Sequence, residues 1–186
     1  MATRVLGVAG SVRSDSHNRR LLRVAAALLP PEAELVAFSG LKAIPPFDED
    51  DEAFPGPEVN AWREAVSQAD ALLFATPEYN SSVPGVLKNA VDWASRPIAT
   101  AALRNKPTAV IGASTGMFGA VWAQAELRKV LAAMGARVAD VELAVGHAAE
   151  KFDENGALID GTVRQELHDA VSTLVELTLE SLPVAA

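Results

Sequence analysis

The sequence of 186 residues contains no cysteine. Disulfide bonds, a thiol nucleophile and zinc–thiolate sites are therefore excluded. Basic residues are also scarce, because 16 Lys and Arg stand against 24 Asp and Glu, for a formal net charge of −8. Binding to nucleic acid or to an anionic membrane surface requires clustered positive charge. We therefore expect neither a nucleic-acid partner nor a membrane partner.

Long hydrophobic runs are missing as well. The run from Val5 to Ala9 is too short for a signal-peptide core or a membrane span, so we expect a cytoplasmic protein. The three histidines lie far apart in the sequence, which predicts no metal site. The sequence also shows no repeat and no low-complexity tract. Residues 1–186 are therefore expected to form one globular domain.

Short apolar runs alternate with segments of helical periodicity along the chain. The predicted strands are Arg4 to Ala9, Glu34 to Phe38, Ala71 to Ala75, Thr108 to Ala113, and Arg137 to Leu143. The predicted helices are Asn18 to Leu29, Glu58 to Gln68, Pro84 to Ser95, Gly119 to Met134, and Thr162 to Leu182. This alternation predicts a three-layer, doubly wound α/β fold with a parallel sheet.

Ligands of such sheets bind beyond the carboxyl ends of the strands, where the strand order reverses. In the order 2-1-3-4-5, the loops after strands one and three meet there. The first loop lacks the G-x-G-x-x-G pattern of a dinucleotide-binding Rossmann domain, and no acidic residue closes strand two. The sequence therefore favours a different ligand at this edge.

The first loop, Gly10 to Asn18, joins a strand to the start of a helix, a position suited to an anion. Ser11, Ser14, Ser16 and Asn18 offer short donors, and Arg13 adds a fixed positive charge. This combination predicts a phosphate cradle. In the alternative interpretation, Ser16 or Asn18 only caps the helix.

The second loop, Thr76 to Gly85, contains two prolines and the polar residues Glu78 and Asn80, with Tyr79 between them. Such a loop suits the edge of a flat heterocycle, and Tyr79 offers a stacking surface. The alternative is a rigid turn that leads into the helix at Pro84.

The third loop begins at Ser114, and Gly116 allows a ligand to approach the backbone. Two interpretations stay open for Met117 and Phe118, which either cover a ring face or fill the core. Between these loops, Trp93 is interpreted as either a core residue or a subunit contact, and the contact is preferred. Lys88 and Asp92 are spaced as a surface ion pair.

Together these motifs resemble the NADPH-dependent FMN reductase family, which includes chromate, quinone and azo-dye reductases. The resemblance rests on Gly10-Ser11-Val12-Arg13 with Ser16 and Asn18, on Pro77-Glu78-Tyr79-Asn80 with Pro84-Gly85 and Leu87-Lys88-Asn89, and on Ser114-Thr115-Gly116. It implies a flavodoxin-like fold, a five-stranded parallel sheet of order 2-1-3-4-5, and FMN bound without a covalent bond. It also implies a homodimer or homotetramer.

The resemblance assigns roles to residues of all three loops. The residues that it places at the phosphate are Ser11, Arg13, Ser16 and Asn18. The residues that it places along the ribityl chain and the ring are Pro77, Glu78, Tyr79 and Asn80, with Ser114 and Gly116 approaching from the third loop. Family members often have a second glycine and an arginine after the third motif, where this chain has Ala120 and Trp122. The preference between NADPH and NADH is therefore left open.

The expected function is that of an NAD(P)H-dependent reductase. Hydride passes from NADPH or NADH to FMN, and a quinone, a flavin or another small acceptor then takes the electrons in a ping-pong cycle. Because FMN carries the chemistry, no protein side chain is expected to act as a nucleophile or general base. The alternatives are a flavodoxin-like electron carrier or a flavin redox sensor without nicotinamide turnover.

Overall fold

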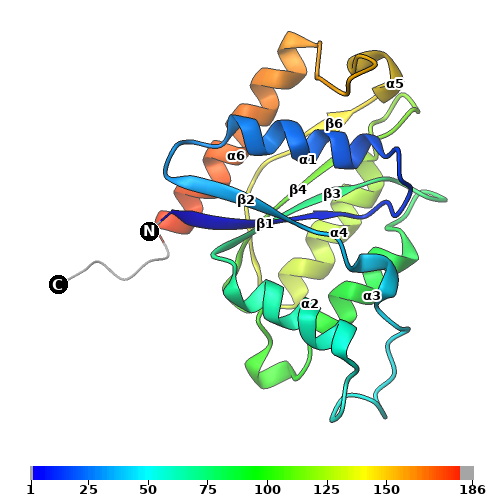
Figure 1. Ribbon diagram of the computed structural model, residues 1–186, viewed down its shortest axis with the longest axis vertical. Coiled ribbons are helices and arrows are strands. Elements are labelled where there is room, and N and C mark those ends of the chain that lie inside the picture. Colours follow the sequence, from blue (N-terminus) through cyan, green and yellow to red (C-terminus); the bar gives the residue numbers. More distant parts are fainter. Residues whose placement is uncertain (1, 181–186) are drawn as a thin grey trace.

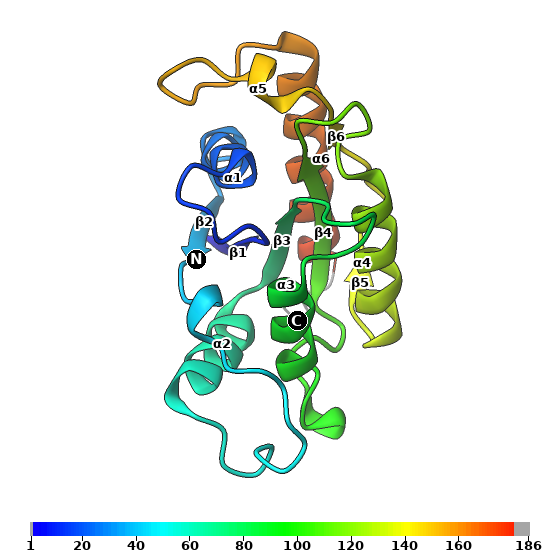
Figure 2. The same ribbon diagram turned by 90° about the vertical axis from the view of Figure 1, so that its right-hand side faces the viewer.

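The computed structural model describes residues 2–180, in which a parallel β-sheet lies between two layers of helices (Figures 1 and 2). The strands are β1 (Thr3–Ala9), β2 (Ala33–Phe38), β3 (Ala71–Thr76), β4 (Pro107–Ala113), β5 (Arg137–Val138) and β6 (Ala144–Val145). Their order is β2-β1-β3-β4-β5, and all neighbouring pairs are parallel. The predicted flavodoxin-like order is confirmed.

The fifth position of the sheet differs from the prediction of a single strand from Arg137 to Leu143. Two short strands occupy it, because β5 pairs with the beginning of β4 and β6 pairs with its end. Between them, the Val141 carbonyl accepts a hydrogen bond from Arg128 of helix α4. The connecting segment is therefore tied to the helix layer, which interrupts the strand.

The helices are α1 (His17–Leu28), α2 (Pro57–Gln68), α3 (Gly85–Ala94), α4 (Val121–Ala133), α5 (Ala148–Lys151) and α6 (Gly161–Leu179), with 3₁₀ turns η1 (Leu41–Ala43) and η2 (Ile98–Thr100). Figure 1 shows α1 and α6 on one face of the sheet and α2, α3 and α4 on the other. The short α5 was not predicted. The last helix was expected to reach Leu182, but α6 ends at Leu179, and residues 181–182 lie outside the described residues. Within residues 2–180, no helix combines the length and hydropathy that a membrane crossing requires.

Alternate residues of the central strands point to opposite faces of the sheet and pack in two separate hydrophobic cores. On β3, Leu73 packs in the core beneath α1 and α6, whereas Leu72 and Phe74 pack in the core beneath α2, α3 and α4. All three side chains are fully buried. Burial of each contributes about 1.5–3 kcal/mol to folding, and burial on both faces holds the ends of the central strands in fixed positions.

The preferred interpretation of Trp93 as a subunit contact is wrong, and the alternative of a core residue is confirmed. Its side chain is only 1% exposed, and its indole N–H donates to the Pro45 carbonyl at 2.8 Å. The long loop between β2 and α2 folds over α3 and supplies this acceptor, so the polar edge of Trp93 is satisfied inside the protein. The predicted pair of Lys88 and Asp92 is present, with 2.7 Å between Nζ and Oδ1.

Candidate functional site

Three loops, after β1, β3 and β4, enclose a cavity of about 310 Å³ at the carboxyl end of the sheet. The residues that line it are Ser11, Arg13, Ser16, His17, Asn18, Pro77, Glu78, Tyr79, Ala113, Ser114 and Thr115. Most of the predicted site residues are therefore brought together. Asn80 and Gly116 belong to the same loops but are not among the lining residues.

The first loop ends in a capped helix. Ser16 has an extended backbone conformation, and its Oγ accepts from the Arg19 amide at 3.4 Å. The capping role considered for Ser16 is therefore present in the structure. It is compatible with anion binding, because the first amides of a helix have no acceptor within the helix.

Arg13 is the cation of this loop that has no protein partner. It is exposed and forms no hydrogen bond or ion pair within the described part of the chain. The acidic residue of the loop, Asp15, is instead paired with Arg20 at 2.6 Å. This hydrogen bond and the charge of Arg20 hold the pKa of Asp15 below its usual range. Arg13 is therefore available to an anion from solution.

Asn18 is buried, and its amide bridges α1 to β4. Its Nδ2 donates to the Ala113 carbonyl at 2.9 Å, and its Oδ1 accepts from the Ala113 amide at 2.9 Å. Both functional groups of the side chain are thus occupied by the end of β4. The predicted contact of Asn18 with a phosphate stays a prediction, whereas its bond to β4 is a feature that the sequence analysis missed.

His17 adds a polar group to the cavity wall. Its ring stacks on Phe152 at 6.0 Å between centroids, and its Nδ1 is buried without a hydrogen-bond partner among residues 2–180. Burial lowers the pKa of this imidazole, and the nearby charges of Arg20 and Arg13 lower it further. These effects all favour the neutral form of the ring.

The second loop folds as a tight reverse turn. Tyr79 and Ser82 exchange backbone hydrogen bonds of 3.2 and 3.1 Å, and the two residues between them, Asn80 and Ser81, have φ values of 53° and 59°. Positive φ at both central positions defines a type I′ turn, which asparagine tolerates well. The turn presents Tyr79 at the cavity, with its hydroxyl 3.5 Å from the Ser11 Oγ.

The Glu78 carboxylate caps helix α4. Its Oε2 accepts from the amides of Trp122 and Ala123, at 3.0 and 3.1 Å. The residue at the N-cap position, Ala120, has a left-handed conformation and no side chain that could cap. A carboxylate from another loop therefore satisfies the positive end of this helix. This oxygen faces α4, a role that the sequence analysis did not anticipate.

Glu126 fixes the same loop from the opposite direction. Its Oε2 accepts from the Ser82 hydroxyl at 2.6 Å and from the Val83 amide at 3.3 Å. The hydrogen bond from Ser82, followed by that from Val83, lowers the pKa of Glu126. Nothing in the local sequence of α4 signalled this role, because Glu126 and Ser82 are 44 residues apart.

The third loop exposes apolar side chains beside the cavity. Met117 and Phe118 are 63% and 53% exposed, so the interpretation that they fill the core is wrong. Phe118 packs edge-on against Trp122 at 4.9 Å between centroids. At Gly119, where φ is +58°, a Cβ would lie 2.5 Å from the Ala144 carbonyl oxygen. Glycine is therefore required for the loop to pass close to β6.

The donor set fits a phosphorylated flavin. Arg13, the hydroxyls of Ser11 and Ser16, and the start of α1 gather positive potential at one end of the cavity. The orphaned Nδ1 of His17 lies in the same wall. Pro77 and Tyr79, which also line the cavity, provide flat and apolar surface for a ring.

Comparison with known proteins gives consistent matches along the chain. The sequence model of the NADPH-dependent FMN reductase family matches residues 3–150. An NAD(P)H-dependent FMN reductase of Pseudomonas aeruginosa is 44% identical over 176 residues, which cover 92% of each chain. A 2-hydroxy-1,4-benzoquinone reductase of a Burkholderia species is 39% identical, over 90% of this chain and 91% of the relative. Among solved structures, the flavoenzyme NAD(P)H:(acceptor) oxidoreductase of Paracoccus denitrificans matches with a TM-score of 0.88 and 32% identity, over 96% of this chain and 98% of the other.

Proposed function

Because the chain belongs to the NADPH-dependent FMN reductase family and is an NAD(P)H-dependent, FMN-containing oxidoreductase, we propose that the three-loop cavity is its flavin site and that quinones are its acceptors. The observation that carries the site assignment is the unpaired Arg13 beside the buried hydroxyls of Ser11 and Ser16 at the start of α1. This is the strongest concentration of anion donors in the cavity.

Different residues would hold the phosphate and the ring of the cofactor. Arg13, Ser11 and Ser16 would hold the phosphate, with the first amides of α1. Pro77 and Tyr79 would border the ring, with Ser114 and the backbone of the third loop opposite them. FMN itself supplies the transfer of hydride and electrons when bound. The protein contributes orientation, and Glu78 and Glu126 keep the ring-bordering loop fixed through α4.

Quinones suit the surface next to this cavity. Tyr79 lines the cavity and is 52% exposed, so its aromatic ring is presented to solvent at the cavity. Flat acceptors stack on such faces. The 2-hydroxy-1,4-benzoquinone reductase among the relatives supports this class of acceptor.

The experiment is to load the purified protein with FMN and to follow NADPH and NADH oxidation with 1,4-benzoquinone as acceptor. We expect a yellow protein that oxidises a nicotinamide cofactor and reduces the quinone. Protein that stays colourless after gel filtration with excess FMN would disprove the site assignment. A yellow protein that reduces free flavin but not the quinone would disprove only the choice of acceptor.

We further propose that the chain is one cytoplasmic domain that assembles as a homodimer or homotetramer. The exposed cluster of Met117, Phe118 and Trp122 supports the assembly, because apolar groups gathered on a surface are typical of interaction sites. Sedimentation equilibrium of the wild type and of Phe118→Ser tests it. A monomeric wild-type protein would contradict the proposal.

A further inference from the structure

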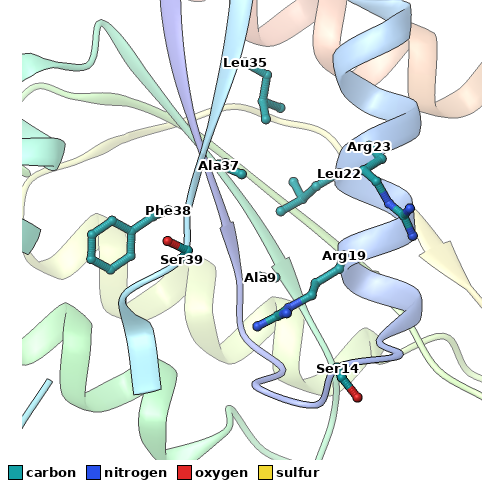
Figure 3. Close-up of a pocket in the computed structure, with 10 residues that line it drawn as sticks. Ala9, Ser14, Arg19, Leu22, Arg23, Leu35, Ala37, Phe38 and Ser39 are labelled. Carbon is teal, nitrogen blue, oxygen red and sulfur yellow. The ribbon is translucent and has the colours of Figure 1, made fainter. Parts of the chain in front are cut away.

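A second and larger cavity, of about 380 Å³, lies between α1 and β2, outside the flavin site (Figure 3). We call it the α1–β2 groove. The small residues Ala9 of β1 and Ala37 of β2 leave the space open, and Leu22 and Leu35, which packs over Gly7, form its apolar walls. A flat apolar ring fits such a groove, because no large side chain fills it.

The charged residues that line this groove are positive. Arg19 and Arg23, one turn apart on α1, line it, and neither forms an ion pair within residues 2–180. Their neighbour Arg20, on another side of the helix, is paired with Asp15. No carboxylate is among the described residues that line the groove. The groove therefore attracts an anion in a protein whose net charge is −8.

The polar groups lie at the end of the groove nearest the flavin site. Figure 3 shows Arg19 extending from α1 into the space between the helix and β2, with Ser39 on the strand side. Ser14, from the same loop as Arg13, also lines this end. The loop from residue 10 to residue 16 thus separates the groove from the flavin site, and both open toward the carboxyl end of the sheet.

We propose that the α1–β2 groove binds the 2′-phosphoadenosine end of NADPH, with the 2′-phosphate on Arg19 and, further out, Arg23. This inference rests on the proposed flavin site, toward which the nicotinamide end would extend. The adenine would lie on the apolar floor, and guanidinium groups bind phosphate through charge-assisted hydrogen bonds.

The end of β2 supports NADPH rather than NADH. In dinucleotide-binding Rossmann domains, whose glycine motif this chain lacks, an acidic residue after the second strand binds the ribose hydroxyls of NADH, and arginine accommodates the 2′-phosphate of NADPH. Here Ser39 follows β2, and Arg19 faces it across the groove. The groove therefore offers recognition of a phosphate and none of the carboxylate contacts that favour a free ribose.

The kinetic test compares Arg19→Ala and the double variant Arg19→Ala/Arg23→Ala with the wild type, as FMN-loaded proteins. We expect KM for NADPH to rise about tenfold or more in the double variant, with KM for NADH and both kcat values unchanged within twofold. The single variant should show a smaller rise. Arg104→Ala is the matched control, because Arg104 is an exposed arginine outside the groove, next to the start of β4.

A binding test separates this inference from the proposed function. Calorimetry measures 2′,5′-ADP and 5′-AMP on the wild type, on the double variant and on Arg104→Ala. We expect 2′,5′-ADP to bind the wild type and the control about tenfold more tightly than 5′-AMP, and the double variant to lose this difference. Equal affinities for the two nucleotides, or a parallel rise of KM for NADPH and NADH, would overturn the inference. A protein that binds 2′,5′-ADP in this way but oxidises neither cofactor would instead contradict the proposed function.

Discussion

The loops after β1 and β3 both carry polar residues to the same cavity, but they use them differently. In the first loop, Arg13 has no partner among residues 2–180, and the first amides of α1, apart from that of Arg19, have no acceptor within the helix. In the second loop, Glu78 and Ser82 are engaged by α4. The first loop is built to receive an anion, whereas the second is built to hold its own shape.

The carboxylates of Glu78 and Glu126, which join the second loop to α4, act in opposite directions. Glu78 reaches from the loop to the start of α4, and Glu126 reaches from α4 back to the loop. Their combined effect is to fix Tyr79, which lies between these two contacts in the chain. A residue of a binding motif can therefore act by positioning its neighbours. Substitutions of ligand-binding residues and of positioning residues should therefore have different effects on FMN affinity and on stability.

The largest effect is expected for Asn18, which belongs to the first loop's motif but bonds to β4. Asn18→Leu keeps the size of the side chain and leaves the buried N–H and C=O of Ala113 without partners. We expect the free energy of unfolding of the FMN-free protein to fall by about 2–4 kcal/mol, measured by urea denaturation. The control is Asn60→Leu, where an exposed side chain on α2 bonds to the Pro55 carbonyl. If the two variants are equally stable, Asn18 does not carry the structural role described here.

Arg13→Ala should instead weaken FMN binding and leave the stability of the FMN-free protein nearly unchanged. We expect the Kd for FMN to rise about 10-fold to 100-fold, because one charge-assisted hydrogen bond to the phosphate contributes about 1.5–3 kcal/mol. The free energy of unfolding without FMN should stay within about 0.5 kcal/mol of wild type, since Arg13 is exposed and has no partner among residues 2–180. Fluorescence titration with FMN gives the first quantity and urea denaturation the second. An unchanged Kd would remove Arg13 from the site.

The sequence predicted what depends on local pattern. The buried strand around Leu72 and Phe74 is a continuous apolar run, and Gly135 ends α4 with φ of +85° as a glycine after a helix does. Ser11 and Arg13 reach the cavity because the carboxyl end of β1 leads directly into it. Strand order and the location of the site follow from these patterns and from the general rule for doubly wound sheets.

The sequence did not predict contacts between distant segments. The sequence around Trp93 does not distinguish a core residue from a subunit contact. Only the loop that folds over α3 shows that the indole N–H of Trp93 is hydrogen-bonded inside the protein. Glu78 looks like a ligand for a ring edge, because the weak cap of α4 lies 42 residues later, at Ala120. The groove beside Arg19 likewise depends on small residues of two strands that pair only in the folded sheet. Periodicity and motif spacing carry no information on such pairings.

Glu78→Ala, unlike Arg13→Ala, should lower the stability of the protein. The variant loses the cap of α4, so we expect the free energy of unfolding of the FMN-free protein to fall by about 1 kcal/mol. Urea denaturation measures it. Glu58→Ala is the control, because Glu58 lies in the first turn of α2, where no side chain of residues 2–180 caps the helix. A variant as stable as wild type, with FMN affinity reduced instead, would show that Glu78 serves the ligand directly.

The smallest effect is expected for Glu126, whose hydrogen bonds to Ser82 and Val83 hold its pKa below the ordinary value of 4.5. A carboxylate with a lowered pKa stabilises the folded state above the unfolded-state pKa, and this contribution is lost as the pH falls through the folded-state pKa. Glu126→Gln should therefore be less stable than wild type at pH 7, by about 0.5 kcal/mol because the group is largely exposed. The two proteins should converge as the pH falls below 4.5. Urea denaturation at both pH values measures the difference, and a gap that persists in acid would mean that the charge of Glu126 does not hold the second loop.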